Sequence, residues 1–190
     1  MQIDVVPELQ GEIAEALIQK QQKHNRLVKL ASVFARTNSV LTSKRISVNV
    51  VDMPHQHAPA WSSTTDVWLN SAVCSDLNAQ SILSLQGLDF HELAHLLYTP
   101  RNSHLLVKQV QDEKLWEAFN CLEDSRIENL LVGYLPSIKS WLTATIADYL
   151  MGDEQAIKTA YPLVVGRKYL PTEMHQLAVD NYSQVDDIDE

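Results

Sequence analysis

Two histidines and a glutamate near the middle of the chain have the types and spacing of a hydrolytic metal site. They lie in the motif His-Glu-Leu-Ala-His, with His91, Glu92 and His95 at its defining positions. The run from Leu88 to Tyr98 predicts a helix, on which residues four apart project from one face. Both imidazoles can then bind one metal ion, with Glu92 placed to act on a water molecule held by that ion. The motif predicts zinc as the cofactor and amide hydrolysis as the chemistry.

A structural alternative is a pair of core histidines hydrogen-bonded to backbone, with Glu92 at the surface. The flanks of the motif are mainly apolar, which favours a buried helix. A buried helix that carries two imidazoles and a carboxylate must satisfy three polar groups, and one metal ion does so at once. We therefore favour the metal site over the structural alternative.

A zinc site needs a third protein ligand, and a later helix predicted over 112–132 supplies acidic candidates. Asp124 is followed four residues later by Glu128, which suits a ligand and a carboxylate that orients a ligand histidine. Asn120 lies one turn before Asp124 on the same helix face. Glu123 reaches further and stays open as the rival ligand. We expect Asp124 to bind the metal, with Glu128 and Asn120 supporting the ligands.

Other polar residues are candidates for oxyanion stabilisation, and the sequence does not choose among them. His55 and His57 flank Gln56 in a proline-bounded loop, and we expect them to be exposed rather than metal-binding. For Glu123, a surface ion pair with the residue three positions later is an ordinary alternative. The oxyanion candidates are Tyr98, His104, Arg126 and Tyr134.

Composition narrows the class of protein. The chain has 190 residues, is 45% hydrophobic and has a formal net charge of -9, which disfavours a nucleic-acid partner. Cys74 and Cys121 form no CxxC pair, which favours a reduced, cytoplasmic protein. The beginning of the chain lacks the layout of a signal peptide, and no apolar run approaches the ~20 residues of a membrane span. We expect a cytoplasmic protein with no membrane partner.

Hydrophobic periodicity predicts an α+β fold that is mostly helical with a small sheet. The strands are expected at Ile46–Val51 and Ala60–Leu69, and Gly133 is expected to cap the helix that starts near Asp112. The expected helices are Glu8–Arg36, Asn78–Tyr98, Asp112–Val132 and Ser137–Met151.

The motif at 91–95 with a later helical acid resembles the gluzincin group of zinc metallopeptidases. This chain departs from the usual pattern of a glutamate with an aspartate four residues later, because it carries Asp124 with Glu128. The blocks 60–70, 91–99 and 120–128 resemble the metallopeptidase-like N-terminal region of phage and bacterial proteins related to the cobaltochelatase T subunit. Such proteins often continue through an acidic linker into a von Willebrand factor A domain.

This resemblance implies a zincin-like domain over 1–180 and an acidic tail over 181–190, which suits the start of a linker to an absent second domain. It also implies that an edge strand beside the metal helix pairs with substrate by strand addition. Thr64, Thr65 and Asp66 begin the candidate stretch. An ordinary edge strand that packs its tryptophans on the core is the alternative.

Two functions follow. The first is a zinc peptidase acting on a peptide or protein substrate, in which Glu92 takes a proton from the zinc-activated water. The second, which the resemblance implies, is a metal-stabilised adaptor or scaffold that works with a MoxR-type AAA+ ATPase and hydrolyses nothing. Glu92 favours the peptidase because a structural site has no need of a carboxylate there.

Overall fold

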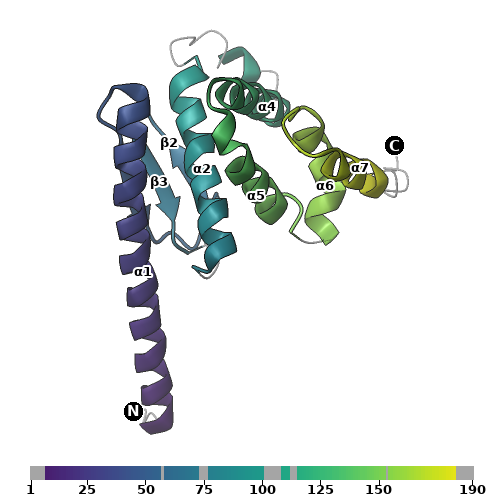
Figure 1. The fold of residues 1–190 in the computed structure, drawn as a ribbon. Coiled ribbons are helices and arrows are strands. Elements are labelled where there is room, and N and C mark those ends of the chain that lie inside the picture. Colours follow the sequence, from purple (N-terminus) through teal and green to yellow (C-terminus); the bar gives the residue numbers. More distant parts are fainter. Residues whose placement is uncertain are drawn as a thin grey trace.

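A computed structural model describes residues 7–56, 58–72, 77–100, 108–111, 115–152 and 154–182. Within these ranges helices predominate and three short strands form one mixed sheet, so the expected α+β class is confirmed. In Figure 1 the sheet lies between the first helix and α2, and the later helices lie on the other side of α2. No described helix is long and apolar enough to cross a membrane.

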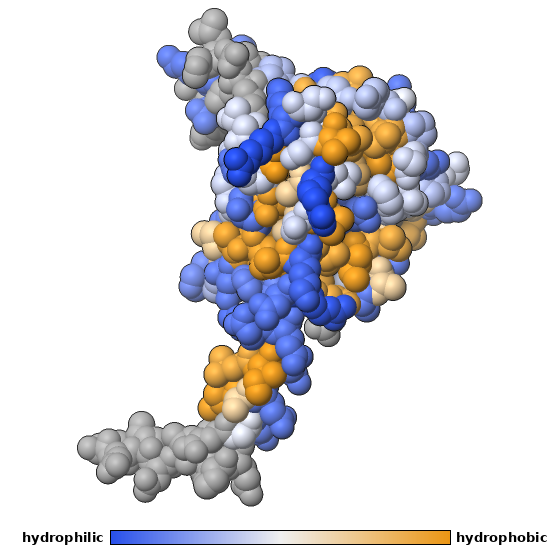
Figure 2. All heavy atoms as spheres, turned by 60° about the vertical axis from the view of Figure 1, so that its left-hand side comes forward, coloured by the Kyte–Doolittle hydropathy of each residue, from blue (hydrophilic) through white to orange (hydrophobic). Residues whose placement is uncertain are grey.

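Helix α1 spans Pro7–Thr42, which is longer at its C-terminal end than the sequence predicts. Its second half packs on the sheet and α2 through a stripe of buried residues at helical spacing, which includes Leu27, Ala31 and Phe34. Leu27 is the first buried residue of this stripe in chain order. The part of the described helix before it is therefore not buried by the fold (Figure 2).

Helix α2 spans Ala79–Tyr98 and carries the histidine motif. Asn78 caps its start, because the side-chain oxygen accepts a hydrogen bond from the Ser81 amide at 2.9 Å. Thr99 ends the helix, and the following proline disfavours its continuation. These signals explain why the sequence predicts both ends correctly.

The sheet differs from the expectation. The predicted strand over 60–69 is a hairpin, in which β2 (Ala60–Ser62) pairs antiparallel with β3 (Asp66–Asn70). Strand β1 (Ser47–Val51) pairs parallel with the other side of β3, so the order is β1-β3-β2. Strand β3 is therefore central, and the prediction that it forms an edge is wrong.

The chain reversal also explains why the alternation misled the prediction. Trp61 and Trp68 have opposite parity along a single strand, yet the hairpin sets them directly opposite each other. Their rings stack with centroids 6.1 Å apart. Thr64 and Thr65 lie in the turn between β2 and β3, and Asp66 begins β3.

The remaining helices pack beyond α2. The expected cap at Gly133 is wrong, because α4 continues through it to Tyr134, and Leu135 ends the helix before Pro136. Gly87 lets α2 approach α5 closely, since a Cβ at that position would lie 2.1 Å from the Trp141 carbonyl oxygen. The elements are α4 (Trp116–Tyr134), the 3-10 helix η1 (Pro136–Ile138), α5 (Lys139–Tyr149), α6 (Glu154–Val165) and α7 (Thr172–Tyr182).

Two hydrophobic clusters share α2 as their common wall. One joins α1, the sheet and the first half of α2, and includes Leu27, Val67 and Leu88. The other joins α2 to the later helices and includes Leu93 and Ile127. This packing holds the second half of α2 against α4. Helix α7 reaches Tyr182, so the first two residues of the expected tail are helical, and 183–190 lie outside the described residues.

Candidate metal centre

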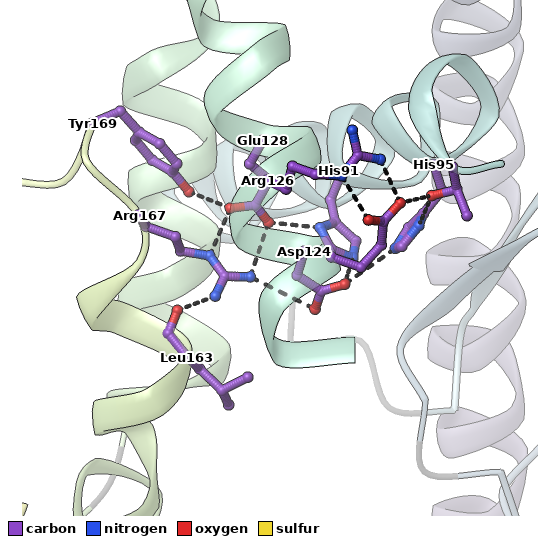
Figure 3. Close-up of polar contacts among 10 residues, drawn as sticks. His91, His95, Asp124, Arg126, Glu128, Leu163, Arg167 and Tyr169 are labelled. Atoms are coloured by element: carbon purple, nitrogen blue, oxygen red, sulfur yellow. Dashed lines mark hydrogen bonds and ion pairs between the residues drawn. The ribbon is translucent and has the colours of Figure 1, made fainter. Parts of the chain in front are cut away.

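Three potential ligands meet where α2 faces α4. His91 and His95 project from one face of α2, and Asp124 reaches them from α4 (Figure 3). The Asp124 Oδ1 atom lies 3.3 Å from His95 Nε2 and 4.0 Å from His91 Nε2. One ligand atom from each residue lies within 4.8 Å of the others. The chain packing therefore brings together the two histidines of the motif and the acid that the sequence favours.

The Nδ1 nitrogen of His91 is hydrogen-bonded to the carboxylate of Glu128. His91 Nδ1 lies 2.6 Å from Glu128 Oε1, and Glu128 is only 1% exposed. An ionised carboxylate accepts hydrogen bonds, so this contact keeps a proton on Nδ1 and leaves Nε2 as the nitrogen that faces Asp124. Glu128 thus lies where the sequence expects a carboxylate that orients a ligand histidine.

A buried arginine compensates the charge of Glu128. Arg167, which is 2% exposed, donates from Nε to Glu128 Oε2 at 2.6 Å and from Nη2 to Oε1 at 3.1 Å. Tyr169 donates its hydroxyl to Oε2 at 2.7 Å. Burial raises the pKa of Glu128, but the hydrogen bond from His91 and the charge of Arg167 outweigh it and lower the pKa to about 2. Glu128 therefore stays ionised.

Arg167 comes from the connection between α6 and α7, which packs tightly on α4. Asn129 donates to the Gly166 carbonyl at 2.8 Å, and a Cβ at 166 would lie 2.6 Å from Ser125 Oγ. The absence of a side chain at Gly166 thus allows the close approach that brings Arg167 to the site. Its Nη2 atom also lies 3.7 Å from Asp124 Oδ2, on the side of the carboxylate away from the histidines (Figure 3).

The second histidine is held through a hydroxyl. His95 Nδ1 lies 2.9 Å from Thr99 Oγ1, and the same hydroxyl donates to Glu123 Oε1 at 2.8 Å. Since the hydroxyl proton is given to Glu123, the oxygen accepts from His95 Nδ1–H. The other ring nitrogen, His95 Nε2, faces Asp124, as His91 Nε2 does. Both ligand nitrogens are therefore set by hydrogen bonds on the opposite edge of each ring.

Glu123 is engaged away from the three ligand atoms. Arg126 donates to both of its carboxylate oxygens at 2.7 Å, and also to the Tyr98 carbonyl at 2.9 Å. Burial raises the pKa of Glu123, but its hydrogen bonds from Arg126 and Thr99 outweigh burial and lower it. The geometry favours Asp124 over Glu123 as the ligand. Glu123 instead accepts the hydrogen bond of the Thr99 hydroxyl, which contacts His95 Nδ1.

The buried charges around His91 strongly favour its protonated form. Burial lowers the pKa of His91, but the hydrogen bond to Glu128 and the charges of Glu128, Asp124 and Glu92 raise it to about 9. Without a metal, a proton therefore occupies the place that the cation would take. Glu92 itself is only 6% exposed.

The other candidates are scattered or outside the described residues. Asn120 is half-buried on α4, and Tyr134 is 70% exposed at the end of that helix. Arg126 is occupied by Glu123 and the Tyr98 carbonyl. The expected substrate strand at Thr64, Thr65 and Asp66 has lost its basis, because β3 pairs on both sides. His55 is exposed, as predicted, whereas His57 and His104 lie outside the described residues.

The sequence reasoning missed Arg167, Tyr169 and the hydrogen-bonding role of Thr99. Thr99 carried a signal, because it lies four residues after His95 and thus on the same helix face. Arg167 and Tyr169 lie in the connection after α6, and no sequence pattern near them predicts a contact with α4. Only tertiary packing brings them to Glu128.

Comparisons of the chain with known protein families, curated proteins and solved structures gave no match. The resemblance to metallopeptidase-like proteins therefore stays a prediction.

Proposed function

We propose that this protein is a zinc-dependent peptidase that hydrolyses peptide bonds with His91, His95 and Asp124 as metal ligands and Glu92 as general base. The observation that carries the proposal is the convergence of the three ligand groups within 4.8 Å, in a chain whose motif also supplies Glu92.

The ligand set suits zinc. Two imidazoles and a carboxylate are typical of catalytic zinc sites, which keep a fourth position for water or substrate. A tetrahedral ion with ligand bonds of about 2.0–2.1 Å sets ligand atoms roughly 3.3 Å apart. The distances from Asp124 Oδ1 to His95 Nε2 and His91 Nε2, 3.3 and 4.0 Å, need only a small adjustment. The hydrogen bonds on both Nδ1 atoms would fix the rings for this role.

Glu92 is the residue assigned to proton transfer. A zinc ion here would lower the pKa of a water molecule toward neutrality and polarise the substrate carbonyl. The Glu92 carboxylate would accept a proton from that water as the water oxygen bonds to the carbonyl carbon, and would deliver this proton to the leaving amine as the C–N bond breaks.

A second candidate is the metal-stabilised scaffold that docks an AAA+ ATPase. The observation that favours it is the extent of the buried network. The contacts of His91, Glu128 and Arg167 tie together α2, α4 and the α6–α7 connection. A metal ion added to this network would cross-link distant parts of the chain, as structural zinc sites do.

Glu92→Gln separates the two functions. Glutamine has nearly the same size but cannot accept the proton, so we expect cleavage of unfolded protein or a peptide library to fall ~10²–10⁴-fold with zinc content unchanged. His95→Ala serves as the control that loses metal and activity together. A candidate ATPase partner is added in parallel. If the wild type and Glu92→Gln both hold zinc and are equally inactive in every condition, the scaffold replaces the peptidase.

A further inference from the structure

The two carboxylate oxygens of Asp124 face different partners. Oδ1 lies 3.3 Å from His95 Nε2 and 4.0 Å from His91 Nε2, on the side of the candidate metal position. Oδ2 lies 3.7 Å from Nη2 of Arg167, on the other side of the carboxylate (Figure 3). A carboxylate can bind a cation through one oxygen or through both. The contact with Arg167 therefore bears on which of these two modes Asp124 can adopt.

Arg167 is held through both its side chain and its backbone. Its Nε and Nη2 atoms donate to the two carboxylate oxygens of Glu128 at 2.6 and 3.1 Å, and Nη1 donates to the Leu163 carbonyl. Its amide donates to the Val164 carbonyl at 3.0 Å, and its own carbonyl oxygen lies 3.1 Å from His175 Nε2. The side chain is buried. The guanidinium group therefore has little freedom to move.

Compensation of the Glu128 charge does not by itself account for the contact with Asp124. Arg167 already reaches both oxygens of Glu128, and Tyr169 donates a further hydrogen bond to Oε2 at 2.7 Å. The Nη2 atom carries two hydrogens, so it can donate one to Glu128 and direct the other toward Asp124. The planar fork of an arginine suits such a contact with two acids at once. The approach to Oδ2 is thus a second role of the same side chain.

We propose that Arg167 is a positioning residue of the candidate metal centre, which holds back Oδ2 of Asp124 so that this carboxylate binds the metal through Oδ1 alone. This inference rests on the proposed function for the metal and its three ligands. For both oxygens to reach one cation, the carboxylate must tilt toward the histidines, and Oδ2 must then leave Arg167. Separation of opposite charges is unfavourable where little water screens them, so the ion pair resists this tilt.

Binding through one oxygen matters for hydrolysis, because it leaves a coordination position for water. Catalytic zinc sites take three protein ligands and keep the fourth position for water or substrate. A second oxygen from Asp124 would compete for that position. Arg167 is buried, so it acts on the open position through Asp124 and not by contact with the substrate.

The visible spectrum of the protein loaded with Co²⁺ in place of zinc tests the proposal. Four-coordinate Co²⁺ absorbs visible light several-fold more strongly per ion than Co²⁺ of higher coordination, because a tetrahedral field has no centre of symmetry. We expect the strong absorption in the wild type and a several-fold loss in Arg167→Met, where both oxygens of Asp124 can bind. Elemental analysis checks that each protein holds the same amount of cobalt, and circular dichroism checks that it is folded.

A matched pair of variants gives the same test without the buried charge of Glu128. Glu128→Gln and Arg167→Met/Glu128→Gln differ only at position 167, and this pair decides the question if Arg167→Met alone does not fold. The first keeps Arg167 beside Asp124 and should show the strong absorption, whereas the double variant should lose it. Tyr169→Phe removes the other side chain that donates to Glu128 Oε2 and should resemble the wild type.

The outcomes distinguish the role of Arg167 from the proposed function. If the wild type binds cobalt but the double variant has the same spectrum as Glu128→Gln, the role of Arg167 is wrong and the metal site stands. The same holds if the wild type already shows the weak absorption, or if the double variant binds no cobalt where Glu128→Gln does. A wild type that binds neither cobalt nor zinc overturns the proposed function, and the role of Arg167 with it.

Discussion

The Nδ1 atom of His91 lies 2.6 Å from the carboxylate of Glu128, and this contact connects the candidate metal centre to the interior of the protein. Glu128 is in turn bound by Arg167, which also lies 3.7 Å from Asp124. The buried Arg167 therefore contacts both Asp124 and Glu128, which lie on the same face of α4. Its removal would leave Glu128 without its principal compensating charge.

Asp124→Ala should weaken zinc binding far more than Glu123→Ala. In the proposed site Asp124 supplies a ligand atom, whereas Glu123 contacts His95 only through Thr99. We expect Glu123→Ala to lower affinity ~10–100-fold, the range of an outer hydrogen-bond partner. Competition with a zinc chelator measures both variants. The reverse order would transfer the ligand role to Glu123.

Arg167→Met should destabilise the metal-free protein by about 3–5 kcal/mol, because it leaves the buried Glu128 charge uncompensated. The double variant Arg167→Met/Glu128→Gln removes both charges and should recover part of this loss. Denaturant unfolding of the four proteins in the cycle measures the coupling. Additive losses would show that the two side chains act independently and would contradict the buried pair.

Zinc affinity should rise with pH up to about 9. Burial lowers the pKa of His91, but Glu128 and the neighbouring acids outweigh it and raise the pKa to about 9, so below that pH zinc must displace a proton. The unperturbed histidine value would place this dependence near pH 6. Chelator competition from pH 6 to 9 measures it.

Glu128→Gln is the matched control for this pH dependence. It removes the charge and the carboxylate hydrogen bond that raise the pKa of His91 most. The pH dependence of this variant should therefore lie at lower pH than that of the wild type. A wild-type affinity that is constant between pH 7 and 9 would mean that His91 is already neutral there.

Asp89→Asn should stabilise the protein above neutral pH. Asp89 is 1% exposed and accepts from Asn38 Nδ2 at 2.9 Å, while Asn38 Oδ1 has no hydrogen-bond partner among the described residues. An amide at 89 keeps the first bond and can donate the missing one, so we expect a gain of about 1–3 kcal/mol at pH 8.

The sign of the Asp89 effect with pH follows from its pKa. Burial is the largest cause and raises the pKa from 3.8 to about 7, against the hydrogen bond from Asn38. The neutral Asp89 carboxyl contributes its whole free energy of stabilisation to the wild type below pH 3.8, and this contribution is lost as the pH rises through about 7. The advantage of Asp89→Asn should therefore shrink on acidification. Thermal unfolding at pH 5 and 8 measures it, with the exposed Asp148→Asn as control.

The sequence predicts best where local signals decide the structure. The Asn78 cap and Pro100 define α2, and helical periodicity alone sets His91 beside His95. The spacing of Asp124 and Glu128 also anticipates their separate contacts in the site. These predictions need no knowledge of the fold.

The sequence predicts poorly where a reversal or tertiary packing decides the structure. The hairpin at 63–65 contains serine and threonine but no glycine or proline, so the alternation reads through it as one strand. Arg167 and Tyr169 reach Glu128 only because Gly166 allows close packing on α4. No pattern near either residue predicts a buried polar network.

The zinc content of purified protein tests the central claim most directly. Wild type purified without chelator, or reconstituted after removal of metal, should contain about one zinc per chain by elemental analysis, in keeping with the one three-ligand group among the described residues. His95→Ala, which removes one ligand and leaves the helix intact, should contain far less. No zinc in the wild type under either condition, or equal zinc in His95→Ala, would contradict the account.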